Sequence, residues 1–328
     1  MQLPNLLRTA VEQELSTVSF SALSAAASEL SDRYRQQRKT DRFITTDAHR
    51  LAYLAVRMPA TFAAVGKALA QFGGNIQPES LLDLGAGTGA AAWAAAEAFD
   101  SLRQFTLIEQ DRGLIELGRK LGQQSEALQV AEWRAANLNS LAEFPPHDLV
   151  ICSYSLGEIE PAAARKILNA AWQAAKQVLI LIEPGTMKGF ATVRAARDQL
   201  IEAGAFLLAP CPHSGACPMP TDESDWCHFA ARFDRTSLHR RLKGGSLGYE
   251  DEKFSYVAAA KHPVTPAAAR VIRHPLRQPG FTQLQLCTPE GLQTISITKR
   301  DKDAWKRARK VDWGDSFDRI ASQKENSK

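Results

Sequence analysis

The chain has 328 residues, enough to bury a full core in one main domain with appendages, and a net charge of only +4. Hydrophobic residues make up 45% of it, and no apolar run reaches the roughly 18 residues of a membrane span, so no membrane partner is expected. Five cysteines without a secretory signal argue against a disulfide framework, and the lack of a signal or transit peptide predicts a cytoplasmic protein.

The first part of the chain is predicted to be helical. Residues 1–72 are rich in Ala, Leu, Glu, Gln and Arg and show no strand-like alternation. Pro59 is expected to end one helix near Met58 and to begin another. The turn-rich segment 73–78 then marks a boundary, so residues 1–74 are predicted to form an N-terminal helical segment.

Strands and helices alternate in the middle of the chain. Near-continuous apolar strands joined by helices indicate a parallel sheet that is covered on both faces. Residues 75–208 are therefore predicted to form a Rossmann-like core. The expected strands are 80–84, 105–109, 129–133, 148–153 and 177–183, and the expected helices are 88–99, 112–121, 161–176 and 189–203.

Beyond Leu208 the sequence becomes rich in Cys, His, Pro and Gly and reads mainly as loops. Near its end, strands at 282–287 and 292–298 flank the turn Thr288-Pro-Glu-Gly291 and predict a hairpin. Residues 209–328 are therefore expected to form an extension that carries cysteines and basic residues.

A glycine-rich loop, Asp83-Leu-Gly85-Ala-Gly87-Thr-Gly89, follows the first predicted strand. Glycines allow backbone amides to approach a ligand, and the helix that follows favours an anionic group at its N-terminus. Glu109 ends the second strand, where a carboxylate would accept hydrogen bonds from ribose hydroxyls. Gly85-x-Gly87-x-x-Ala90 fits a dinucleotide fingerprint, and the whole loop resembles the first motif of class I methyltransferases, which bind S-adenosylmethionine.

Asp83 favours S-adenosylmethionine, because a dinucleotide-binding strand is usually apolar at that position; a glycine turn that serves only packing is the remaining alternative. Asn137, after the third strand, is predicted to contact the adenine, and Ser153 lies at the carboxyl end of the fourth strand, where ligands bind in such sheets. The sequence thus predicts an α/β protein with a class I methyltransferase-like Rossmann sheet, an N-terminal helical segment and a Cys-rich C-terminal extension.

No residue is clearly placed to deprotonate a methyl acceptor. Glu158 is the nearest candidate, and a carboxylate that begins a helix is the more ordinary reading of the same residue. The catalytic residues therefore stay unassigned. An oxidoreductase using NAD is the more remote alternative, because it would need a second nucleotide-binding half that the sequence lacks.

Four cysteines, Cys211, Cys217, Cys227 and Cys287, lie in the predicted extension. No CxxC pair occurs among them, which is unlike a zinc ribbon. Four thiolates suit either a [4Fe-4S] cluster or tetrahedral zinc, and free structural thiols are the third reading. Cys152 lies inside an apolar strand and is expected to be a buried core thiol.

Two segments are strongly basic. Residues 299–310 hold seven Lys or Arg against two Asp, and residues 232–243 hold a second group. These charges indicate a polyanionic partner such as RNA, or else an ordinary solvated helix face. The residues predicted to bind RNA are Arg240, Arg241, Lys243, Lys306, Arg307, Arg309 and Lys310.

Several longer segments resemble a known family, the methyltransferase-like proteins associated with the small ribosomal subunit in mitochondria, together with their bacterial relatives. The resemblance runs roughly from Ala52 to Phe317. The segments that carry it are Ala52–Phe62, Asp83–Gly89, Ile182–Thr186, Ala209–His213, Asp225–Phe229, Gly248–Tyr256 and Ala308–Asp315.

The resemblance implies a class I methyltransferase fold, binding to small-subunit ribosomal RNA during assembly or translation, and a [4Fe-4S] cluster held by Cys211, Cys217, Cys227 and Cys287, with zinc as the alternative. Two functions follow. One is an S-adenosylmethionine-dependent ribosomal RNA methyltransferase, and the other is a non-catalytic assembly factor that clamps RNA. The Asn/Asp-Pro-Pro-Tyr/Phe motif that orients an exocyclic base nitrogen is missing after the fourth strand, where Tyr154-Ser-Leu-Gly157 stands instead.

Overall fold

The computed structural model describes residues 1–35, 44–72, 74, 76–220 and 224–317. At its centre lies a sheet with the strand order β3-β2-β1-β4-β5-β8-β6, and β7 pairs with β8 outside this path. The first five strands run parallel, whereas β8 runs antiparallel to its neighbours. The bounds are β1 (Ser80–Leu84), β2 (Gln104–Glu109), β3 (Glu132–Ala135), β4 (His147–Ser153), β5 (Ala175–Pro184), β6 (Phe206–Ala209), β7 (Phe229–Asp234) and β8 (Tyr249–Ala260).

This strand order confirms the predicted fold class. The chain moves outward from β1 to β3, crosses back to β4, and ends with one antiparallel strand between β5 and β6. The direction of winding therefore reverses between β1 and β4. A crevice forms at the carboxyl ends of these two strands, and open α/β sheets bind their ligands in such a crevice.

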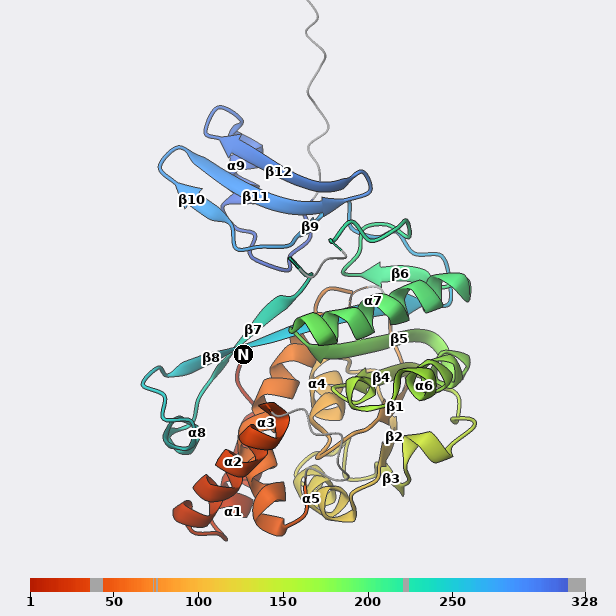
Figure 1. The fold of residues 1–328 in the computed structure, drawn as a ribbon, viewed down its shortest axis with the longest axis vertical. Helices are drawn as coiled ribbons and strands as arrows, with labels where there is room; N and C mark the ends of the chain where they lie inside the picture. Colours follow the sequence, from red (N-terminus) through yellow and green to blue (C-terminus); the bar gives the residue numbers. More distant parts are fainter. Residues whose placement is uncertain (36–43, 73, 75, 221–223, 318–328) are drawn as a thin grey trace, which may run out of the picture.

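Helices cover both faces of the sheet (Figure 1). Side chains alternate along each strand, so Leu81 and Ile151 pack with the first helices, while Leu82 and Cys152 pack on the opposite face. Each such buried aliphatic side chain contributes roughly 1.5–3 kcal/mol. The helices are α3 (Asp47–Leu69) and α4 (Ala90–Ala98) on one face, and α6 (Pro161–Ala174) and α7 (Met187–Glu202) on the other, with α5 (Arg112–Gly122) between β2 and β3.

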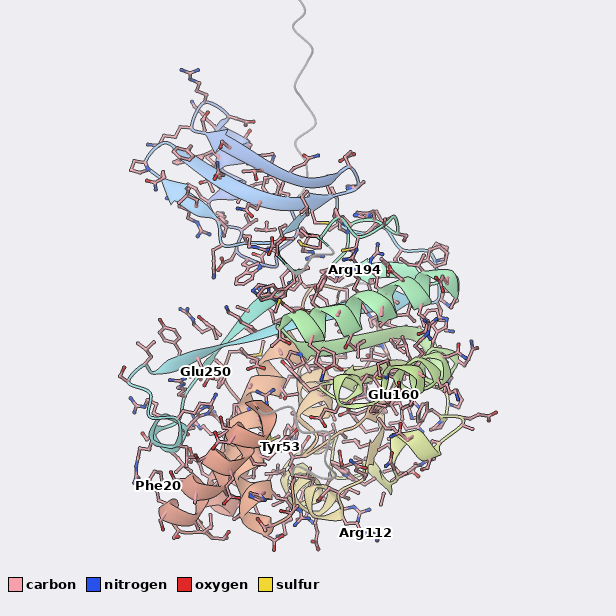
Figure 2. All side chains as sticks on the ribbon, in the orientation of Figure 1. Phe20, Tyr53, Arg112, Glu160, Arg194 and Glu250 are labelled. Carbon is pink, nitrogen blue, oxygen red and sulfur yellow. The ribbon has the colours of Figure 1, made fainter. Side chains whose placement is uncertain are left out.

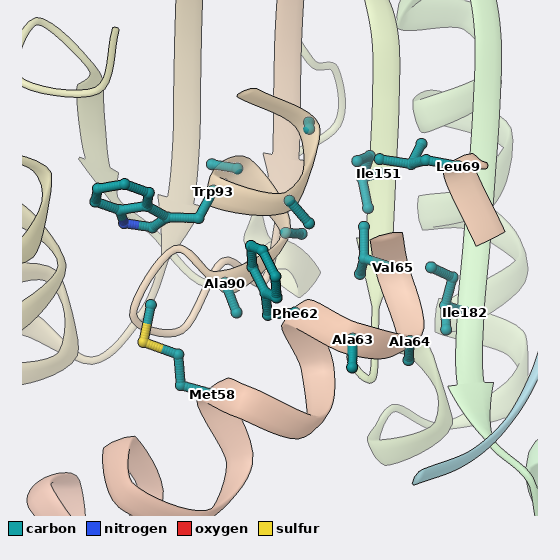
Figure 3. Packing of buried hydrophobic residues seen from close by; sticks show 14 of the residues in the cluster. Met58, Phe62, Ala63, Ala64, Val65, Leu69, Ala90, Trp93, Ile151 and Ile182 are labelled. Atoms are coloured by element: carbon teal, nitrogen blue, oxygen red, sulfur yellow. The ribbon is translucent and has the colours of Figure 1, made fainter. Parts of the chain in front are cut away.

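The helix α3 corrects one prediction, because it continues through Pro59 instead of ending near Met58. A proline inside a helix costs about 3 kcal/mol, since one backbone hydrogen bond is lost. Here the apolar residues on both sides of Pro59 are buried against α4 and the sheet, and Figure 3 shows Phe62 and Val65 facing Trp93 and Ile151. Burial of this long face outweighs the local cost.

The N-terminal helical segment is present as predicted. α1 (Asn5–Leu15) and α2 (Phe20–Arg35) both pack against α3. Within the described residues, no helix has the length and apolar character needed to cross a membrane.

The strands β7 and β8 were missed by the sequence prediction. Residues 250–253 of β8 are charged, and they lie on the two-stranded ribbon that extends beyond the sheet, whereas Phe254–Ala260 is buried between β5 and β6. The third strand also begins later than predicted, at Glu132. The central sheet thus continues past residue 208, the predicted end of the Rossmann-like core, because β6 to β8 complete it.

A second, smaller antiparallel sheet lies apart from the first, at the top of Figure 1. Its hairpin confirms the prediction, with Thr288 and Gly291 as the closing pair. Val271, Leu284 and Ala304 belong to its separate core. Its elements are β9 (Arg270–Val271), β10 (Leu276–Gln278), β11 (Phe281–Thr288), β12 (Gly291–Thr298) and α9 (Lys302–Ala308).

Candidate functional site

The glycine-rich loop joins β1 to α4 as predicted. Gly85, Gly87 and Gly89 all have positive φ angles, of 78°, 57° and 85°, which side chains disfavour. A Cβ on Gly85 would lie 2.6 Å from the Cβ of Ser155, and one on Gly87 would lie 3.0 Å from the hydroxyl of Tyr53. The glycines are thus required by the turn itself and by the protein atoms packed over it.

Glu109 lies at the end of β2 and braces this loop. Its carboxylate accepts backbone hydrogen bonds from Gly87 at 2.9 Å, from Gln110 at 2.8 Å and from Asp111 at 2.9 Å. Burial raises the pKa of Glu109, and these three N–H groups oppose that rise. A carboxylate has about four acceptor positions, so one remains for a ligand hydroxyl.

Asp83 is completely buried beneath the loop. Neither of its carboxylate oxygens has a hydrogen-bond partner among the described residues. Burial, and then the charge of Glu109, raise the pKa of Asp83 to about 7. The backbone N–H of Ala92 points the other way and lowers this pKa, although it does not reach hydrogen-bond geometry with the carboxylate. A buried, unpaired carboxylate is rare in folded proteins and points to a functional position.

The loop after β4 is held in an unusual conformation. Among the described non-glycine residues, Tyr154 alone has a positive φ, of 54°, a strain that costs roughly 1–3 kcal/mol. Its hydroxyl donates to Glu252 at 3.0 Å, and Arg57, whose guanidinium lies 5.1 Å from the centre of the tyrosine ring, pairs with the same carboxylate at 3.3 Å. Ser153 is buried at the strand end beside this network.

Two more carboxylates lie at this edge. Glu183, at the end of β5, accepts hydrogen bonds from the N–H groups of Leu156 and Gly157, both at 3.0 Å, and burial raises its pKa to about 7. Glu158 ends the short 3-10 helix η3 (Leu156–Glu158), and burial of its carboxyl group and then the charge of Glu109 raise its pKa to about 7. The residue as a whole is nevertheless exposed to solvent. We call Asp83, Glu109, Glu158 and Glu183 the acid recess.

Asn137 lies after β3, as predicted for an adenine contact. Its side-chain oxygen accepts the N–H of Asn139 at 2.9 Å and caps the short helix η2 (Leu138–Ser140). Sequence reasoning missed the roles of Tyr53, Arg57, Glu183 and Glu252 in this region. All four lie within segments that carried the family resemblance, so the sequence contained a signal for them, although β8, which carries Glu252, was not predicted as a strand.

The structure brings the four cysteines of the extension to one pocket, which has a volume of about 40 Å³ and is also lined by His213. Cys287 Sγ lies 3.9 Å from His213 Nε2. Burial and then the neighbouring thiols raise the pKa of Cys287 to about 12, and burial raises the pKa of Cys211 and Cys227 as well. Cys152 is fully buried in the core, as predicted, far along the chain from this pocket.

The cysteine pocket is tied firmly to its surroundings. Arg197 donates to the carbonyls of His213 and Gly215, which fixes the loop between Cys211 and Cys217. Trp226 Nε1 donates to the Gly185 carbonyl at 3.0 Å, next to the end of β5, and Ser255 Oγ donates to the Cys227 carbonyl at 2.8 Å. The pocket therefore lies between the central sheet and the small sheet.

The thiols do not converge on one point. In the part of the chain that the structure describes, no three His, Cys, Asp or Glu side chains are placed to hold a single metal ion. Zinc requires four ligands within roughly 2.0–2.3 Å of one ion, whereas the cysteines of a [4Fe-4S] cluster each bind a different iron and stand farther apart. Both groups are bound by four thiolates, so the four cysteines that line this pocket are compatible with either.

The two predicted basic segments differ in their surroundings. On α8 (Ser237–Leu242) and just after it, Lys243 pairs with Glu250, Arg241 stacks 4.0 Å from the centre of the Phe20 ring, and Arg240 donates to Ser237. Figure 2 labels Glu250 and Phe20 on either side of this helix.

The cations of α9 and the turn after it are not neutralised. Arg309 stacks 4.6 Å from the centre of the Trp305 ring. Lys306, Arg307 and Lys310 are exposed, and no carboxylate among the described residues lies within salt-bridge distance of them. Of the residues predicted to bind RNA, those around α9 thus remain available to phosphates.

The strand order and the glycine-rich loop define a class I methyltransferase-like protein. Residues 47–318 match the family model described as mitochondrial small ribosomal subunit Rsm22, and the chain belongs to this family, which confirms the resemblance seen in the sequence. The human ribosome assembly protein METTL17, mitochondrial, is 28% identical over 292 residues, which cover 82% of this chain and 62% of that protein. Rsm22-cox11 tandem protein 2, mitochondrial, of Schizosaccharomyces pombe is 23% identical and covers 83% of this chain and 43% of that one. The chain thus spans less than two thirds of the length of these relatives.

Distant likenesses exist among solved structures. Magnesium protoporphyrin IX methyltransferase from Synechocystis has a TM-score of 0.41 and 14% identity, covering 70% of this chain and 90% of that one. The N-methyltransferase NodS from Bradyrhizobium japonicum has a TM-score of 0.41 and 10% identity, covering 62% and 87%. The strand order, rather than these likenesses, defines the fold.

The predicted cytoplasmic location is wrong by this comparison. The family description and the names of the human and yeast relatives are all mitochondrial. The prediction rested on the composition of the first residues, which did not reveal the compartment in which the relatives work.

Proposed function

We propose that this protein is a small-subunit ribosome assembly protein that binds S-adenosylmethionine in the acid recess and ribosomal RNA through the cations around α9. The observation that carries the proposal is the Rsm22 family match over residues 47–318, on a chain that keeps the glycine-rich loop, Asp83 and Glu109 at the crevice of the sheet. The three parts, residues 1–74, 75–208 and 209–328, would supply helical support, the cofactor site, and the cysteine and RNA sites.

The chain's own residues suit this cofactor. Gly85, Gly87 and Gly89 allow the tight turn of the loop, and Glu109 retains acceptor capacity for ribose hydroxyls. Asn137 and Ser153 stand at the ends of β3 and β4, where the adenine and the methionine part would lie. Bound there, S-adenosylmethionine would supply an electrophilic methyl group.

The cysteine pocket would hold a [4Fe-4S] cluster through Cys211, Cys217, Cys227 and Cys287. Support comes from the four thiols, which line one pocket although they are far apart in the sequence. The role we assign to the cluster is structural. It would join the loop between β6 and β7 to β11, and so hold the small sheet with α9 against the central sheet.

The RNA contact would be electrostatic. Lys306, Arg307 and Lys310 carry charges that no described carboxylate offsets, so phosphates could replace their counterions. The residues at α8 would contribute less, because Lys243 is already paired with Glu250.

Methyl transfer is the second candidate activity, and Glu158 favours it, because a solvent-reached carboxylate with a pKa of about 7 suits a general base. Against it, the position where an acceptor base would be oriented holds Tyr154, whose hydroxyl is committed to Glu252.

One experiment separates a non-catalytic assembly protein from a methyltransferase. Anaerobically purified protein and methyl-labelled S-adenosylmethionine are incubated with small subunits from a strain that lacks the gene. We expect bound cofactor and bound subunits without label in the ribosomal RNA. Label that appears with the wild type and is lost in Gly87→Arg would establish a methyltransferase instead. The arginine side chain would collide with Tyr53 and occupy the loop.

A further inference from the structure

Carboxylates outnumber cations around the acid recess. Glu109 raises the pKa of both Asp83 and Glu158, and Glu158 raises that of Glu183, so the four groups lie within electrostatic reach of one another. Two cations face them, Arg57 of α3 and Lys188 of α7. Arg57 is paired with Glu252 of β8, Lys188 is exposed, and Asp111, the N-cap of α5, is neutralised by Arg50. The four carboxylates therefore outnumber Lys188, the cation facing them that pairs with no described carboxylate, and the acid recess carries a net negative charge when they are ionised.

Asp83 gives independent evidence that a partner is missing. It is 0% exposed, yet neither carboxylate oxygen has a donor. Burying an unpaired carboxylate is costly, and folded proteins normally avoid it by pairing the group. Ser155 Oγ, which packs over Gly85, is likewise buried without a partner. Both residues adjoin the glycine-rich loop, because Asp83 begins it and Ser155 packs over Gly85.

Glu158 is the member of the recess that is free to face such a ligand. The other three are held by the protein itself: Asp83 is fully buried, and the carboxylates of Glu109 and Glu183 accept hydrogen bonds from backbone N–H groups. The carboxylate of Glu158 is reached by solvent and accepts no hydrogen bond from any described residue.

We infer that the recess selects its ligand by charge: it binds S-adenosylmethionine, whose sulfonium is positive, in preference to S-adenosylhomocysteine, whose thioether is neutral, and Glu158 is the residue that sets this preference. The inference rests on the proposed cofactor site and goes beyond it, because an ordinary adenosine-and-methionine pocket would accept both ligands. The two ligands differ at the sulfur by one methyl group and one positive charge.

A preference for S-adenosylmethionine over S-adenosylhomocysteine would slow methyl transfer. Transfer of the methyl group removes the positive charge from sulfur, so carboxylates that stabilise the sulfonium bind the reactant better than the transition state. Such a site retains S-adenosylmethionine and responds to its level relative to S-adenosylhomocysteine. That behaviour fits an assembly factor better than a fast methyltransferase.

The test is calorimetric titration of the full chain with S-adenosylmethionine, S-adenosylhomocysteine and sinefungin, which carries an amine in place of the sulfonium. At pH 8 we expect the two cationic ligands to bind at least about tenfold more tightly than S-adenosylhomocysteine, which corresponds to about 1.4 kcal/mol. At pH 6 the preference should shrink, because carboxylates with a pKa of about 7 become protonated. The amino groups that the ligands share cancel in this ratio.

Variants locate the effect. Glu158→Gln should weaken S-adenosylmethionine binding about fivefold or more and leave S-adenosylhomocysteine within about twofold. Glu160→Gln removes the same charge two residues away, where the side chain only caps α6, and should change neither. Equal affinity of the wild type for all three ligands would overturn the charge selectivity alone. No binding of any of them would overturn the proposed cofactor site together with it.

Discussion

Replacing Asp83 by asparagine should stabilise the protein at high pH. The pKa of about 7 in the folded chain lies well above the ordinary 3.8, so the folded state binds more protons than the unfolded state between these values. Stability therefore falls as the pH rises from about 4 to about 7, by an amount of order 4 kcal/mol, since each pH unit of difference is worth 1.36 kcal/mol. Asparagine has no charge to lose, and Asp83→Asn removes this penalty.

The net gain will be smaller than that figure, because a buried amide without partners costs roughly 1–3 kcal/mol itself. We expect Asp83→Asn to be about 1–3 kcal/mol more stable than the wild type at pH 8, and equal or less stable at pH 4. Thermal or urea unfolding of the ligand-free protein across this pH range measures the difference. A variant that is less stable than the wild type at pH 8 would refute the reasoning, because it would mean that the folded chain stabilises the Asp83 carboxylate. In that case its contact with the Ala92 N–H would be a full hydrogen bond.

Three further predictions concern the other parts of the molecule. The three unpaired cations of α9 and the turn after it are Lys306, Arg307 and Lys310. Replacing all three by glutamine should reduce the slope of log K for RNA binding against log salt concentration by about 2, at roughly 0.7 for each lost phosphate contact, whereas Lys243→Gln should change it little. Filter binding at several salt concentrations measures both slopes, and equal slopes would contradict the assignment. Tyr154→Phe should destabilise the fold by about 0.5–1.5 kcal/mol, because the hydrogen bond to Glu252 is lost. Urea unfolding tests this, and an unchanged midpoint would show that the hydrogen bond does not stabilise the fold. Cys227→Ser should lose most of the bound iron and its visible absorbance, while Cys152→Ala should keep both; iron retained by the first variant would remove Cys227 from the ligand set.

The parallel half of the fold could be predicted because its signals are local. The apolar run Ser80–Leu84 was placed to the residue, and helix and strand alternate so regularly up to Glu202 that few errors arose. Pro59 was misjudged because its local cost is visible in the sequence, whereas the burial that offsets it depends on α4 and the sheet.

The strand β8 was missed for a related reason. Its first half is charged and its second half is rich in alanine, and neither half looks like a strand until β5 and β6 are placed on both sides of it. Of the site, Asp83 could be predicted from the loop motif, and Glu109 from its place at the end of the second strand. Glu183 and Glu252 could not, because their roles depend on contacts across the sheet edge with Leu156, Gly157 and Tyr154.

Association with the small ribosomal subunit is the central claim, and density-gradient sedimentation tests it most directly. The protein is expressed in a strain that lacks the gene, at wild-type level, and the gradient is probed for it beside small-subunit RNA. We predict that the wild type sediments with small subunits or their precursors, and that the Lys306→Gln, Arg307→Gln, Lys310→Gln variant moves to the top of the gradient while remaining folded. A wild-type protein found only at the top, in low salt and with S-adenosylmethionine present, would contradict the account.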